Sequence, residues 1–163
     1  MYQMIKKVKA INKLIVLIAL VVLSSCTRQR NKFIWLEHMT FTNSYDKNAV
    51  KISYYVLIDN PETPDEKLKN AINKFVRNRL RTNTSFSKAH VASINFVFYS
   101  KTRNTSYFIT HPEHSGKMSS EEISQYKEDY IATYQVKKCD QGVVEKLYLY
   151  DAPEEIMFDS CKK

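Results

Sequence analysis

The segment VKISYYVLID, residues 50–59, shows the clearest alternation of apolar and polar positions in the chain. Successive side chains of a strand point to opposite faces, so this period of two predicts a half-buried strand. The positions predicted to share the buried face are Val50, Ile52, Tyr54, Val56 and Ile58. The aromatic-rich segment FIWLEHMTFT, residues 33–42, predicts a second strand. The short turn-forming stretch 43–48 predicts that the two strands form a hairpin.

A helix is predicted directly after this strand. Thr63-Pro64-Asp65-Glu66 has the pattern of a capping box with Pro at the first helical position. Apolar residues then recur with helical spacing at Leu68, Ala71, Ile72, Phe75, Val76 and Leu80. One apolar stripe of this kind predicts an amphipathic helix that packs on a sheet.

The other side of this predicted helix is basic. Lys67, Lys74, Arg77 and Arg81 fall within about an 80° arc of the helical wheel. Cations near a helix C-terminus are favoured by the macrodipole, so a solvated face is one interpretation. The alternative is that these four residues form a docking surface for an anionic partner or a lipid headgroup.

The rest of the chain predicts more strands and a second helix. Lys88–Ser100 and Thr105–Thr110 have the composition of strands, and the capping box Ser119–Glu122 predicts a helix that reaches Tyr126 or Tyr130. Residues 131–138 permit a helix or a strand, and their β-branched and aromatic content favours a hairpin over 131–150. The tail from Asp151 is expected to dock on the domain through its apolar residues 156–158.

These elements predict a single α+β domain, residues 33–163, with the order β-β-α-β-β-α-β-β. The expected architecture is an antiparallel sheet with two amphipathic helices. Gly occurs only twice, which excludes glycine-rich phosphate-binding loops. The net charge of +8 falls to +4 for residues 26–163, because residues 1–25 contain four lysines and no acid. This modest charge argues against a nucleic-acid partner.

Residues 1–25 have the layout of a secretory signal peptide. A basic segment precedes the apolar run Leu14–Leu23, and small residues follow it. Leu23-Ser24-Ser25-Cys26 resembles the lipobox of bacterial lipoproteins, in which the cysteine is lipidated and the preceding peptide is removed. One alternative, a retained transmembrane helix, needs about 20 apolar residues, more than this run contains. The other is an ordinary signal peptide cut near Ser25, which would leave Cys26 as a thiol.

The lipoprotein resemblance also implies a location. Residues 26–32 would form a lipidated tether, in which Arg28, Arg30 and Lys32 are basic. In lipoproteins of some Gram-negative lineages, acidic residues after the cysteine mark export to the cell surface. The basic tether therefore implies an exported protein that is lipid-anchored to the cell envelope, in the outer membrane facing the periplasm. The expected partners are the membrane, through the lipid on Cys26, and an envelope protein; no cofactor is expected.

The assignment of Cys26 to lipid leaves Cys139 and Cys161 as an even pair. Disulfides persist in exported proteins, so the two residues are a disulfide candidate. Two separate thiols are the alternative.

His111-Pro112-Glu113-His114 is the one cluster of potential metal ligands in the sequence. His111, Glu113 and His114 lack the spacing of a zincin helix, and an exposed polar loop is the other interpretation. No catalytic residue is assigned, since no Gly-x-Ser-x-Gly motif is present. The predicted function is a lipoprotein with a small non-enzymatic binding or structural domain. The alternatives are a metal-dependent envelope enzyme and an immunity-type protein that neutralises an exported toxin.

Overall fold

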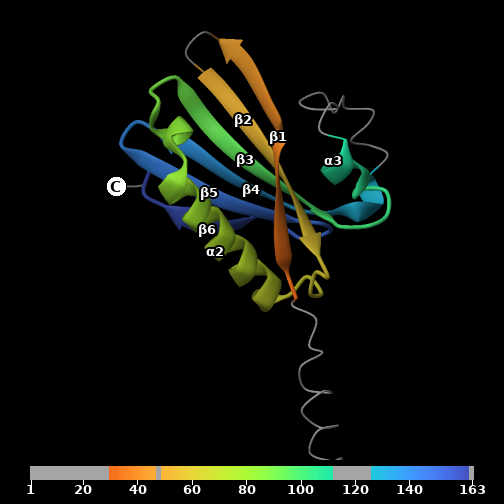
Figure 1. The fold of residues 1–163 in the computed structure, drawn as a ribbon. Coiled ribbons are helices and arrows are strands. Elements are labelled where there is room, and N and C mark those ends of the chain that lie inside the picture. Colours follow the sequence, from red (N-terminus) through yellow and green to blue (C-terminus); the bar gives the residue numbers. More distant parts are fainter. Residues whose placement is uncertain (1–29, 47–48, 112–125, 162–163) are drawn as a thin grey trace, which may run out of the picture.

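The computed structural model describes residues 30–46, 49–111 and 126–161, which form one open six-stranded sheet (Figure 1). The strands lie side by side in chain order: β1 Lys32–Asp46, β2 Ala49–Asp59, β3 Val91–Ser100, β4 Tyr130–Cys139, β5 Gly142–Leu149 and β6 Glu155–Asp159. The helices are α2 Glu66–Thr82 and α3 Tyr107–Thr110, with 3-10 turns η1 Thr84–Ser87 and η3 Lys127–Asp129. Among these described ranges, no helix has the length and apolar character needed to cross a membrane.

The sheet is mixed, which corrects the prediction of a wholly antiparallel one. β1 and β2 form the expected antiparallel hairpin, and β3 to β6 form an antiparallel meander. β2 and β3, however, are parallel, with Tyr54 opposite Phe96. The reason is α2, which carries the chain back along the sheet so that β3 starts at the same end as β2.

The order of elements also differs from the prediction after β3. The segment expected as a strand at 105–110 contains the short helix α3 instead. The Thr105 hydroxyl donates to the Ser100 carbonyl at 2.8 Å and accepts from the Thr102 amide at 2.8 Å. These bonds turn the chain away from the sheet directly after β3. The described order is therefore β-β-α-β-α-β-β-β, in which β6 replaces the expected docking tail.

The second predicted helix falls mostly outside the described residues, since Ser119–Glu122 lies in the range 112–125. Its expected C-terminal part is described and is not α-helical. Lys127–Asp129 form the turn η3, and Tyr130 begins β4. The extension of that helix to Tyr130 was wrong, whereas the predicted hairpin of β4 and β5 is confirmed.

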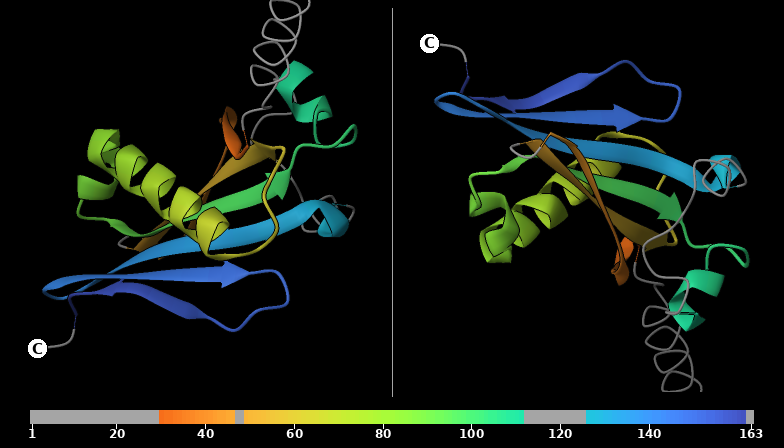
Figure 2. Two further views of the ribbon diagram at one scale, coloured as in Figure 1. Left: turned by 90° about the horizontal axis from the view of Figure 1, so that it is seen from below. Right: turned by 90° about the horizontal axis from the view of Figure 1, so that it is seen from above.

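α2 has the predicted apolar stripe but starts later than its capping pattern indicated. The cap is Asp65, whose carboxylate accepts from the amides of Lys67 at 2.9 Å and Leu68 at 3.2 Å. Leu68, Ile72 and Val76 are buried against the sheet. Figure 2 shows α2 lying across one face of the sheet, with α3 beyond the other face.

β2 is buried on both faces, because each face of the sheet carries an apolar cluster. Tyr54, Val56 and Ile58 belong to the main core beneath α2. Tyr55 and Leu57 belong to a second cluster on the opposite face. The other buried members of this second cluster are Leu36, Met39, Tyr99 and Phe108. The prediction of a half-buried strand was therefore wrong, since residues 52–58 are all buried.

The second cluster makes the fold sensitive to alkaline pH. Burial raises the pKa of Tyr99, Tyr55 and Tyr130 above the ordinary tyrosine value of 10.0. The folded state therefore favours the neutral phenols, so this stabilisation is complete below pH 10 and is lost as the pH rises above 10. We expect the free energy of unfolding, measured by urea denaturation, to fall as the pH rises above 10, the ordinary tyrosine pKa.

Variants separate this effect from the loss of lysine charge in the same pH range. Tyr99→Phe should flatten the pH dependence, because one buried phenol no longer ionises. The matched control is Tyr107→Phe, because the Tyr107 side chain is 38% exposed. Equal pH slopes for the two variants would contradict the prediction.

Candidate functional site

A cleft of about 450 Å³ opens between the edge strand β1 and the C-terminal end of α2. We call it the β1–α2 cleft. It is lined by Trp35, Glu37, Thr40, Tyr54, Arg79, Thr82, Asn83, Thr84 and Ser85. This volume is within the range of small-molecule sites. The cleft is therefore the first candidate for a binding site.

An irregularity in β1 shapes one wall of this cleft. Leu36 pairs with Tyr55 and Thr40 pairs with the adjacent Tyr54, so the intervening residues of β1 have no partner in β2. The Thr40 hydroxyl donates to the Glu37 carbonyl at 3.0 Å and closes this irregular turn. Bulges of this kind bend a strand and redirect its side chains. Glu37 is consequently an exposed residue at the cleft.

Arg79 on α2 places its guanidinium over two aromatic rings beside the cleft. Its guanidinium carbon is 4.8 Å from the Trp35 ring centroid and 5.5 Å from that of Phe75. Trp35 itself packs on the rings of Tyr54 and Phe96. The Arg79 guanidinium makes no hydrogen bond or ion pair with any residue in the described part of the chain. Its N–H donors are therefore available to a ligand.

Asn83 connects the polar part of the lining. Its side-chain amide donates to the Tyr54 hydroxyl at 2.8 Å, and its carbonyl oxygen accepts from the Ser85 amide at 2.8 Å. Its own backbone amide donates to the Arg79 carbonyl at 2.9 Å. Because the Tyr54 oxygen accepts from Asn83, the Tyr54 proton can be donated into the cleft.

The predicted basic face of α2 forms a second, shallower depression. It has a volume of about 510 Å³ and is lined by Asn70, Asn73, Lys74, Arg77, Asn78 and Arg81. Three of the four predicted cations are thus brought together, and Lys67 does not line the depression. Arg77 is also engaged elsewhere, because its guanidinium lies 3.8 Å from the Glu145 carboxylate and over the Phe158 ring.

A hydrogen-bond network joins α2 to the sheet, and it is buried between Tyr134 and Glu145 and exposed between Arg77 and Asn73. The Tyr134 hydroxyl donates to the Glu145 carboxylate, and Arg77 Nε donates to Asn73 Oδ1 at 3.0 Å. Burial, and then the bond to Glu145, raises the pKa of Tyr134. The phenol therefore stays neutral as a donor. The role of Glu145 was not predicted from the sequence, although Glu145 shares strand parity with the inward-facing Leu147.

The predicted metal ligands are only partly described. Glu113 and His114 lie outside the described residues. His111 Nδ1 lies 2.9 Å from the Tyr107 carbonyl oxygen, with its ring stacked on Tyr107. His38 Nε2 contacts the next carbonyl of α3, that of Phe108, at 2.9 Å. Within the described ranges, no three His, Cys, Asp or Glu residues form a group that could hold a metal ion.

The predicted disulfide is confirmed. Cys139 at the end of β4 and Cys161 just after β6 are joined, with a Cα–Cα distance of 5.9 Å. The alternative of two separate thiols was wrong. Cys26, the predicted lipidation site, lies outside the described residues.

Comparison of the chain with protein-family models, with curated proteins and with solved structures finds no match. The functional conclusion therefore depends on the residues of this chain.

Proposed function

We propose that the protein is a cell-envelope lipoprotein, anchored through lipid on Cys26, whose domain binds a ligand in the β1–α2 cleft without catalysing a reaction. The observation that carries the binding function is Arg79. Its guanidinium is oriented by Trp35 and Phe75, faces a cleft of ligand size, and has no counter-ion in the described part of the chain. Charged donors held in place before binding lower the entropic cost of binding.

The contacts at the start of the described domain support a position of this end close to the membrane. Asn31 donates to the Glu62 carboxylate at 2.7 Å and accepts from the Glu62 amide at 2.9 Å, so the chain is fixed from this point onward. The four chain steps from Cys26 to Arg30 span at most about 14 Å when extended. Lipid on Cys26 would therefore hold this end of the domain close to the bilayer.

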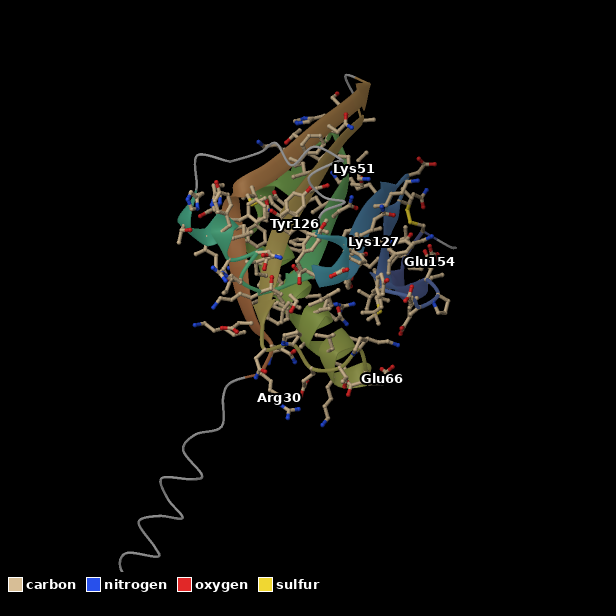
Figure 3. The ribbon with its side chains drawn as sticks, turned by 90° about the vertical axis from the view of Figure 1, so that its right-hand side faces the viewer. Arg30, Lys51, Glu66, Tyr126, Lys127 and Glu154 are labelled. Atoms are coloured by element: carbon tan, nitrogen blue, oxygen red, sulfur yellow. A yellow bond between two sulfur atoms is a disulfide. The ribbon has the colours of Figure 1, made fainter. Side chains whose placement is uncertain are left out.

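α2 starts at the same end of the molecule, as the positions of Arg30 and Glu66 show (Figure 3). With 17 residues, α2 is about 25 Å long. The β1–α2 cleft lies at its far end, beside Arg79 and Asn83. An anchored domain would thus hold its binding site away from the membrane and open to soluble or cell-wall components.

The anchor is tested by Cys26→Ala. We expect this variant to move from the membrane pellet to the soluble fraction, because stable anchoring needs two or more acyl chains on the protein. Immunoblotting of fractionated cells measures the distribution. The matched control is Ser25→Ala, which keeps a small residue before the cysteine and should remain in the pellet. A Cys26→Ala protein that stays in the pellet would disprove lipid anchoring.

The alternatives stay predictions. A metal-dependent enzyme would use His111, Glu113 and His114, and metal analysis of the purified full-length protein tests it. An immunity-type function requires an exported toxin as partner, which co-purification with that toxin would test.

A further inference from the structure

We propose that the β1–α2 cleft recognises a zwitterionic peptide, with Arg79 binding the terminal carboxylate and Glu37 binding the terminal ammonium. This inference rests on the proposed function only in its choice of the cleft as the binding site. It adds the chemical class of the ligand.

Arg79 has the geometry of a carboxylate receptor. A guanidinium held over a ring keeps N–H donors available, and their fork matches a carboxylate in a bidentate pair. Neighbouring arginines of α2 differ in this respect, because their guanidinium groups already have protein acceptors. Arg77 donates to Asn73, and Arg81 donates to Asn78. In the part of the chain that the structure describes, the Arg79 guanidinium lies over the Trp35 and Phe75 rings and has no protein acceptor.

Glu37 provides the opposite charge on the strand wall. Among the described residues, it is the one carboxylate that lines the cleft, and it forms no ion pair with any of them. Arg79 and Glu37 therefore do not neutralise each other, although both line the same space. A carboxylate at this position disfavours a phosphate or a dicarboxylate and favours a ligand that carries a cation.

The remaining lining residues fit a peptide between these two charges. Tyr54 can donate its hydroxyl proton to a peptide carbonyl, because its oxygen already accepts from Asn83. Thr84 and Ser85, which also carry hydroxyl groups, line the cleft as well. A sugar is disfavoured, since the Trp35 ring already contacts Arg79 and Tyr54 and is not an open stacking platform.

Trp35 gives a direct measurement, because it is the only tryptophan in the chain. The full-length protein in detergent is titrated with trialanine, and the Trp35 emission is recorded. We expect a saturable change. N-acetyl-trialanine lacks the ammonium and trialanine amide lacks the carboxylate, so each should bind at least about tenfold more weakly. Inorganic phosphate should produce no saturable change.

Variants assign the two charges. In Arg79→Gln, trialanine should no longer bind more tightly than trialanine amide. Arg79→Lys should keep only part of this difference in affinity, because lysine lacks the planar guanidinium. In Glu37→Gln, trialanine should no longer bind more tightly than N-acetyl-trialanine. Arg81→Gln on the same helix lies outside the cleft and should leave all affinities unchanged; circular dichroism checks that each variant is folded.

The outcomes separate this inference from the proposed function. A saturable response to phosphate but not to trialanine would overturn the zwitterionic ligand and retain the cleft as a binding site. Failure of every probe to change the Trp35 emission would overturn peptide binding at the cleft. An effect of Arg81→Gln as large as that of Arg79→Gln would also overturn it. Neither result would change the outcome of the Cys26→Ala fractionation.

Discussion

Replacing both Cys139 and Cys161 with Ser is expected to lower the free energy of unfolding by about 3 kcal/mol. The two residues are 22 positions apart, so their bond closes a loop that the unfolded chain would otherwise explore freely. In the chain-entropy model, a loop of this length gives a stabilisation of this size.

The disulfide also holds the edge strand β6, whose other contacts include the ion pair of Glu155 with Lys69 of α2 and the Phe158 ring beneath Arg77. β6 has five residues and pairs only with β5, and its Ile156 and Phe158 side chains are 53% and 42% exposed. Next to the bond, the Ser160 amide donates to the Val143 carbonyl at 3.0 Å. Gly142 permits this close approach, because a Cβ there would lie 2.7 Å from the Ser160 carbonyl oxygen. Loss of the bond should therefore release β6 before the rest of the sheet.

Urea denaturation with and without a reductant measures the effect, in a Cys26→Ala background that avoids a third thiol. The reductant should destabilise the parent protein and leave the double Ser variant unchanged. Hydrogen exchange should become faster first in β6. If the double Ser variant loses less than about 1 kcal/mol in free energy of unfolding, the disulfide adds little to the stability given by the pairing of β5 with β6.

Local patterns predicted the elements that depend on local sequence. The apolar stripe of α2 and the alternation in β2 were sufficient to place both elements. The disulfide followed from the number of cysteines once Cys26 was assigned to lipid. The predictions were wrong where tertiary contacts determine strand pairing or burial. The parallel pairing of β2 and β3 depends on the path of α2, and the burial of Tyr55 depends on the second cluster.

The candidate site was not predictable by the same means. Trp35 and Arg79 are 44 positions apart, and Arg79 was not among the four cations of the predicted basic face. Their contact exists because α2 crosses the sheet and brings its C-terminal end beside β1. The predicted basic face was recognisable from one helix alone, but Arg77 turned out to be engaged with Glu145.

Replacing Phe96 with Ala is expected to lower the free energy of unfolding by about 4 kcal/mol, the loss typical of a large cavity in a closely packed core. Phe96 is fully buried in β3. It pairs with Tyr54 on one side and Tyr134 on the other, and its ring lies 5.9 Å from that of Trp35. The substitution thus removes volume at the centre of the sheet and beneath the binding cleft.

Urea denaturation followed by circular dichroism measures the loss, and two variants control for it. Phe96→Leu keeps most of the volume and should cost about 1 kcal/mol. Phe158→Ala removes an exposed ring from edge strand β6 and should cost less than Phe96→Ala. A loss for Phe96→Ala no larger than that for Phe158→Ala would contradict the packing of this core. Because Trp35 rests on Phe96 and in turn orients Arg79, folded Phe96→Leu should also bind trialanine more weakly, which would connect the central strand of the sheet to the affinity of the cleft.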